Sequence, residues 1–99
     1  MTAREFKTGS IVIGAAGREK GLPFLVVGTT AEGLLLLSDG DTRKLAAPKK
    51  KKPMHVRYTP LRCGAVAEKL AAGKPVTDSE IRKALAEQGM NIREQTEEG

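Results

Sequence analysis

Short hydrophobic runs separated by turn-forming residues characterise the first two-thirds of the chain. In residues 10–14, Ile11 and Ile13 share one face, and β-branched residues in such a run favour a strand. Pro23 suits the start of a strand or a sheet edge, where its missing N–H interrupts no central ladder. The pattern predicts five strands, at residues 10–14, 24–28, 34–38, 43–46 and 54–59.

The third of these runs, residues 34–37, consists of four leucines and could also form a helix by propensity alone. It is short, however, and it lies between Gly33 and the turn-forming residues 38–41, so we interpret it as a strand. The Asp39–Gly40 dipeptide is favoured in tight hairpin turns and predicts a fourth strand directly after it. Five short strands favour a small closed barrel, because closure removes exposed sheet edges.

Helical signals replace the strand pattern after Pro60. Residues 64–72 are rich in good helix formers and are followed by Gly73, where a helix can end. A capping box, in which Thr77 and Glu80 bond each other's backbone amides, predicts a second helix over residues 78–88. Residues 93–99 contain three glutamates and no apolar anchor, so we expect them to be disordered.

The expected organisation is therefore mainly β with a C-terminal α segment, within one compact unit. A five-stranded barrel occupies residues 1–62 and includes a basic tract at residues 48–53, where Pro48 and Pro53 enclose four consecutive lysines. Because prolines stop a helix and like charges repel, we expect this tract to be extended and exposed. A helical pair at residues 63–92 packs on or beside the barrel, and the tail at residues 93–99 follows.

Positive charge is concentrated in the predicted barrel. The chain of 99 residues has a net charge of +5, but residues 1–62 carry +7 and residues 63–99 carry −2. A positive field raises the local concentration of polyanions such as nucleic acid, although many basic proteins bind none. Only 39% of the residues are hydrophobic and three are aromatic, which argues against a deep apolar substrate pocket.

Catalytic chemistry finds little support in the residue types present. His55 is the only histidine and Cys63 the only cysteine, so neither a zinc site nor a Cys–His catalytic pair can be assembled from spacing. Asp39 and Asp41 flank Gly40 and are explained by turn chemistry, and the glycines of residues 14–21 lack the ending of a nucleotide-binding loop. We expect no enzymatic activity, no cofactor and no metal.

The same composition indicates a compartment. A lone cysteine forms no intramolecular disulfide, which fits a reducing environment. No apolar stretch approaches the length of a membrane span, and the first residues lack the apolar core of a signal peptide. We therefore expect a cytoplasmic protein without membrane contact.

The order of motifs resembles a known family. A KOW motif is resembled by three segments in succession: residues 9–13, the basic glycine loop 17–21 and residues 24–27. The order of the segments that follow, 38–44, 49–52 and 55–59, is similar to that in the KOW-containing large-subunit ribosomal proteins of archaea and eukaryotes. Residues 76–85 resemble the C-terminal segment of their short bacterial relatives. Many KOW motifs have a glycine after the basic loop, where this chain has Leu22–Pro23. The resemblance implies an SH3-like barrel and RNA, including ribosomal RNA, as ligand.

Candidate RNA-binding residues are cations placed to reach phosphates without first breaking internal pairs. They lie on the loop between the first two strands, after the Asp39–Gly40 turn, in the lysine tract and in the last strand. Phe24 is expected in the core, whereas Tyr58 is either a stacking residue or buried at a barrel end. The candidates are Arg18, Lys20, Arg43, Lys44, Lys49, Lys50, Lys51, Lys52, Arg57 and Tyr58.

Three functions are open at this point. The leading hypothesis is an RNA-binding protein associated with ribosomal RNA or ribosome assembly, which reads RNA shape and backbone because aromatic residues are scarce. The alternative is a protein-interaction module that docks on a transcription or ribosome-assembly factor through the barrel or the amphipathic terminal helices. Nonspecific DNA binding is the third, since charge alone does not distinguish the two nucleic acids.

Overall fold

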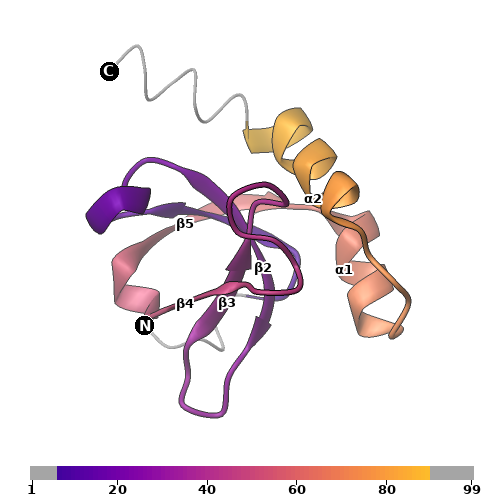
Figure 1. Ribbon diagram of the computed structural model, residues 1–99, viewed down its shortest axis with the longest axis horizontal. Coiled ribbons are helices and arrows are strands. Elements are labelled where there is room, and N and C mark those ends of the chain that lie inside the picture. The colour runs from indigo at the N-terminus through magenta and orange to yellow at the C-terminus, as the bar shows by residue number, and fades with distance from the viewer. Residues whose placement is uncertain (1–6, 90–99) are drawn as a thin grey trace.

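The computed structural model describes residues 7–89. Five strands come first and two helices follow, as the ribbon in Figure 1 shows. The strands are β1 (Ser10–Gly14), β2 (Pro23–Thr29), β3 (Leu35–Ser38), β4 (Lys49–Lys51) and β5 (Val56–Arg62), and the helices are α1 (Gly64–Ala71) and α2 (Asp78–Ala84). Short 3-10 turns η2 (Gly17–Glu19) and η3 (Pro53–His55) precede β2 and β5, and a π-type turn η4 (Leu85–Gly89) extends α2.

The five strands form one antiparallel sheet in the order β4-β3-β2-β1-β5. The prediction of a mainly β chain with C-terminal helices is confirmed, but the predicted closure is wrong, because β4 and β5 are the two edges and do not pair. Two local features explain the open edges. β4 has only three residues, and η3 with its N-terminal Pro53 turns the chain before β5 begins.

The predicted fourth strand at residues 43–46 is also wrong, since these residues belong to the loop between β3 and β4. The carboxylate of Asp39 shapes this loop by accepting hydrogen bonds from the amides of Asp41 and Arg43 and from the Thr42 hydroxyl. The fourth strand is formed by the lysine tract itself. The tract was expected to be extended and exposed; it is extended, but it pairs with β3 as a strand.

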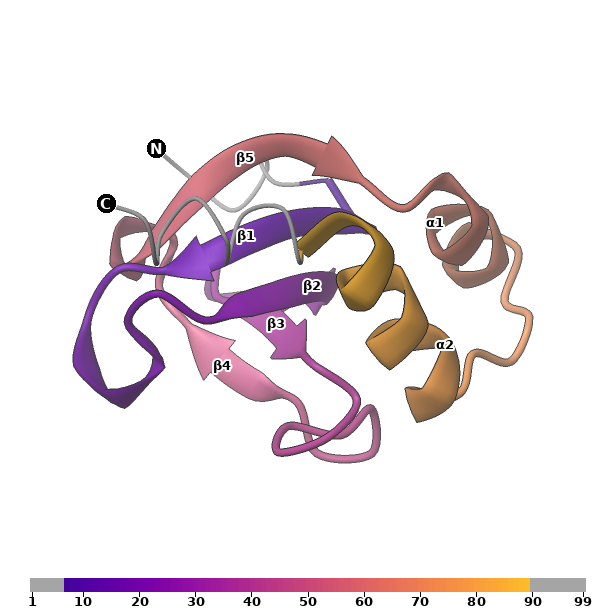
Figure 2. The same cartoon turned by 90° about the horizontal axis from the view of Figure 1, so that it is seen from above.

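Both faces of the sheet are buried over part of their area. On the concave face, one apolar cluster joins residues of β1, β2, β3 and β5. Because β5 and β3 are not neighbours in the sheet, this contact requires the sheet to curl. The cluster consists of Val12, Phe24, Val26, Leu35, Leu37 and Val56. Figure 2 shows this curvature from above. Phe24 is buried in this cluster, as expected for a core residue. The curl thus provides an interior without complete strand pairing around it.

The helices cover the other face of the sheet. Ile11 of β1 and Leu25 of β2 share a second apolar cluster with Val66, Ile81, Ala84 and Leu85. The Thr77 hydroxyl accepts from the Glu80 backbone amide at 3.2 Å, so the predicted start of α2 is confirmed. The Glu80 carboxylate, which the capping box directed to the Thr77 amide, accepts from Lys69 of α1 at 2.8 Å. Helix α2 ends at Ala84, and the helical path continues through η4 to Gly89, close to the predicted end at residue 88.

Helix α2 also holds the β3–β4 loop. The Leu45 amide donates to the Asp78 carboxylate at 2.8 Å, and the Arg82 guanidinium donates to the Gly40 carbonyl at 2.6 Å. Gly40 has a φ of 73°, and a Cβ at this position would clash with the Asp78 carbonyl. The helical pair is therefore part of the same folded unit as the sheet.

Some sequence-based expectations fall outside the described range. The tail at residues 93–99 and the C-terminal part of the 63–92 segment beyond residue 89 are among them. Within residues 7–89, no helix has the length and apolar character needed to cross a membrane.

Candidate nucleic-acid interface

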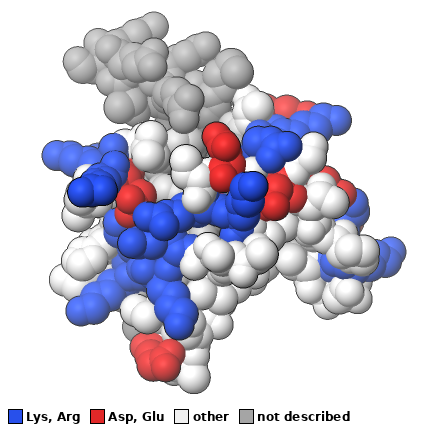
Figure 3. Space-filling view, in the orientation of Figure 1, with Lys and Arg blue, Asp and Glu red and all other residues white. Residues whose placement is uncertain are grey.

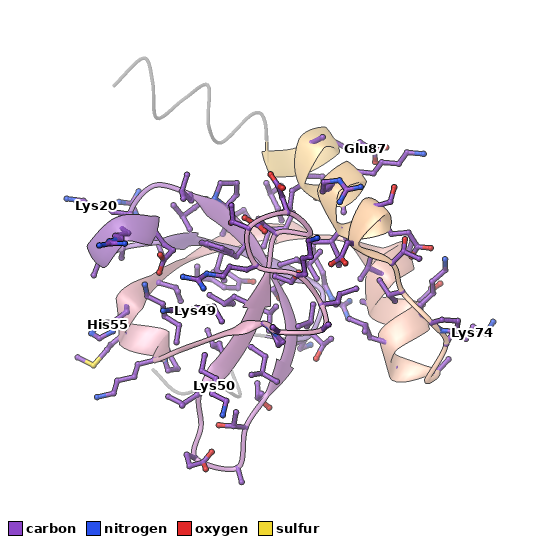
Figure 4. All side chains as sticks on the ribbon, in the orientation of Figure 1. Lys20, Lys49, Lys50, His55, Lys74 and Glu87 are labelled. Carbon is purple, nitrogen blue, oxygen red and sulfur yellow. The ribbon has the colours of Figure 1, made fainter. Side chains whose placement is uncertain are left out.

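The ten candidate residues separate into two groups by their exposure. Arg43, Lys49 and Lys51 are partly buried. The exposed group consists of Arg18, Lys20, Lys44, Lys50, Lys52, Arg57 and Tyr58. A space-filling view shows Lys and Arg gathered over the β4 side of the molecule (Figure 3), and Lys20, Lys49 and Lys50 lie on this side, away from Lys74 and Glu87 (Figure 4). The fold thus brings most of the predicted cations to one side.

The pairing of β4 with β3 explains why consecutive lysines differ in exposure. Lys49 pairs with Leu37 and Lys51 with Leu35, so both lysines share the face of two core leucines. Lys50 pairs with Leu36 and points to the opposite face. Lysines pointing inward on an edge strand bury their aliphatic stems and also discourage pairing with another chain.

The loop between β1 and β2 reaches across to both edges of the sheet. The Ala15 amide donates to the His55 carbonyl at 2.9 Å, directly before β5, and Lys51 of β4 donates to the Ala16 carbonyl at 3.3 Å. Gly14 permits this arrangement, because a Cβ there would collide with the Glu19 backbone. Glu19 is consequently held beside β4.

Glu19 forms the centre of a cationic cluster, defined here as Glu19, Arg43, Lys49 and Lys51. Its carboxylate lies 3.1 Å from the Lys51 ammonium and 3.7 Å from the Arg43 guanidinium. The Glu19 side chain is 14% exposed and that of Lys51 is 11% exposed, whereas the Arg43 side chain is 39% exposed. Lys51 therefore has an internal role, and the partly exposed Arg43 is only loosely paired.

The cluster lowers the pKa of Glu19. The hydrogen bond from Lys51 is the largest cause, followed by opposing desolvation and by the charges of Lys51, Lys49 and Arg43. Glu19 thus carries a full negative charge at neutral pH. Asp39 behaves similarly: burial raises its pKa, but the hydrogen bonds from Thr42 and from the Arg43 and Asp41 amides outweigh this and lower it.

A depressed pKa predicts acid sensitivity. Because the folded state holds the Glu19 pKa below its unfolded value, the stabilisation is fully present above the unfolded pKa and is lost as pH falls through the folded pKa. We expect the melting temperature to fall more steeply below about pH 5 for the wild type than for Glu19→Gln. Thermal melts followed by circular dichroism between neutral and acid pH measure this difference; parallel curves would contradict it.

The remaining exposed candidates lie at the edges of this cationic side. Arg18 and Lys20 are on and next to η2, at the end of the molecule away from the helices in Figures 1 and 2. Arg57 and Tyr58 follow η3 on β5, and the Tyr58 side chain is 51% exposed, so the buried alternative for Tyr58 is wrong. Of the two cations after the Asp39–Gly40 turn, Lys44 is the more exposed.

Two features of the site were not predicted from the sequence. No role was predicted for Glu19; it gains one because the pairing of β4 with β3 brings Lys51 and Arg43 next to its carboxylate. Met54 in η3 is 75% exposed and lies between the candidate segments. Met54 was predicted to begin the last strand, at residues 54–59, but it lies in η3 and β5 begins at Val56.

The described residues were also compared with the requirements of a metal site. Within residues 7–89, no group of three or more His, Cys, Asp and Glu side chains could hold a metal ion.

No protein-family model matches the chain, and comparison with curated proteins finds no match. The KOW resemblance therefore remains a prediction based on the motifs quoted above.

Proposed function

We propose that this chain is a non-catalytic RNA-binding protein that engages backbone phosphates through the β4 side of the sheet. The observation that carries the proposal is the exposure of Lys50 and Lys52 on and beside an edge strand, together with Arg18 and Lys20 on the neighbouring loop. Among the described residues, none of these four cations takes part in an ion pair within 4.0 Å. No ion pair within 4.0 Å has to be broken before they contact phosphates.

The curled sheet and its interior cluster are compatible with an SH3-like arrangement of the KOW type. In this proposal the open edges leave β4 accessible to ligand. A scarcity of exposed aromatic residues favours recognition of folded or duplex RNA by shape and backbone, with Tyr58 and Arg57 at the periphery. The association with ribosomal RNA or ribosome assembly rests on the resemblance and is part of the proposal.

Crosslinking in cells followed by sequencing of the attached RNA tests this function. We expect reads concentrated in one region of the large ribosomal RNA; a scatter over messenger RNAs would remove the ribosomal part. Competition between matched RNA and DNA duplexes tests the ligand class, because the 2′-hydroxyl separates them. Equal competition would favour nonspecific nucleic-acid binding.

One observation supports a protein-interaction function as the second candidate. The exposed Met54 side chain offers apolar contact area on the same side as the cations. The terminal helices support it less, because Val66, Ile81 and Ala84 already pack against the sheet. Replacing Met54 with Gln should leave RNA affinity unchanged and abolish a co-purifying protein if docking on a partner is the main function.

A further inference from the structure

Glu19 neutralises part of the proposed RNA interface in the free protein. The cationic cluster has three positive groups around one carboxylate and a formal charge of +2. Lys51 donates to both Glu19 and the Ala16 carbonyl, and its side chain is only 11% exposed. The Arg43 contact is longer, at 3.7 Å, and its side chain is more exposed.

From this geometry we infer that Glu19 is a specificity-determining residue that competes with RNA phosphates for Arg43 and Lys51. The inference rests on the proposed RNA-binding function. A phosphate that binds at the cluster must displace the Glu19 carboxylate from its cations. Breaking these ion pairs reduces the net free energy of RNA binding. Only a ligand that is also held by the exposed cations recovers this cost, so the carboxylate discriminates against loosely bound polyanions.

The two cations differ in how readily a phosphate can recruit them. Arg43 is the first to exchange, because its pair with Glu19 is long and its guanidinium can bind a phosphate in a bidentate manner. Lys51 stays with Glu19 as long as the carboxylate is charged, since this 3.1 Å pair is the shortest that the carboxylate makes. Glu19 therefore keeps Lys51 from contacting the ligand and weakens the contact that Arg43 can make with a phosphate.

Glu19→Gln tests the competition while it preserves an oxygen that accepts from Lys51. With one more phosphate contact available, RNA affinity should rise about five- to eightfold at about 0.1 M salt, and the salt slope should steepen by about 0.7 to 0.9. Affinity for heparin should rise by a larger factor than affinity for RNA. Fluorescence anisotropy over a salt series measures the RNA values.

Glu68→Gln is the matched control, because it removes one exposed negative charge from helix α1, on the opposite side of the structure. If Glu19→Gln retains its circular dichroism spectrum and binds RNA no more tightly than Glu68→Gln, the inference is overturned. If the wild type itself shows no salt-dependent RNA binding, the proposed function fails and the inference fails with it. The two failures are thus distinguishable.

Lys51→Gln supplies a second test that does not depend on the Glu19 variant. In the wild-type background it should leave the salt slope unchanged, because Lys51 is occupied by Glu19. In the Glu19→Gln background the same change should reduce the slope by about 0.7 to 0.9, since a neutral amide holds the Lys51 ammonium by a hydrogen bond only and a phosphate can displace it. A full reduction of the slope in the wild-type background would overturn the inference.

Discussion

Replacing Arg18, Lys20, Lys50 and Lys52 together with glutamine is expected to weaken RNA binding about a thousandfold at about 0.1 M salt. Each exposed cation that neutralises a phosphate contributes about 0.7 to 0.9 to the salt slope, and four such contacts account for the estimate. The four side chains are exposed, and among the described residues none pairs with an acid, so the fold should tolerate the change. Affinity measured over a salt series gives both the loss and the slope.

A matched pair of double variants separates a local interface from net charge. Lys50→Gln with Lys52→Gln and Lys74→Gln with Lys83→Gln remove the same charge from exposed positions. The first two lysines lie on and directly after β4, and the other two lie between the helices and on α2. The first pair should reduce affinity by about 25- to 60-fold, and the second should have only a small, salt-screened effect. Equal losses would show that the protein attracts RNA through its overall charge without a defined face.

Ile81→Ala is expected to destabilise the whole protein by about 2 to 5 kcal/mol. Ile81 is fully buried in the cluster that joins α2 to Ile11 and Leu25 of the sheet, so its truncation leaves a cavity between the two layers. Small domains are often stable by only about 5 to 15 kcal/mol, and the loss is therefore a large fraction of the total. Urea denaturation at neutral pH measures it.

Lys83→Ala on the same helix is the control, because this side chain is exposed and its loss should change stability by less than about 0.5 kcal/mol. Deleting residues 64–99 gives a stronger form of the same test. It would expose Ile11 and Leu25 and release the β3–β4 loop from Asp78 and Arg82, so we expect the remaining chain to unfold. A truncated chain with a native spectrum and unchanged RNA affinity would show that the helices serve another purpose.

The strands that sequence reasoning located best are those with the clearest local signals. β1, β2 and β3 combine apolar or β-branched runs with glycine or Asp–Gly boundaries, and each was predicted to within about two residues. The start of α2 was equally clear, because the Thr77 cap acts over one helical turn. Such signals depend on near neighbours in the chain.

The lysine tract illustrates the opposite case. Four consecutive lysines have low strand propensity, and the tract was expected to be extended and exposed without a strand assignment. It forms β4 because β3 offers an unpaired edge and the lysine stems can cover Leu35 and Leu37. Pairing with the preceding strand therefore decided which lysines of this run point inward and which point outward.

The sequence alone determined which residues are positive, that they are concentrated in residues 1–62, and that strands come before helices along the chain. Only the tertiary structure decided that the sheet stays open, that the helices cover its second face, and that Glu19 pairs with Lys51 of β4. These features depend on contacts between segments about 30 or more residues apart, such as Lys51 with Glu19 and Leu45 with Asp78. Local patterns carry no information on which of several lysines a distant carboxylate will meet.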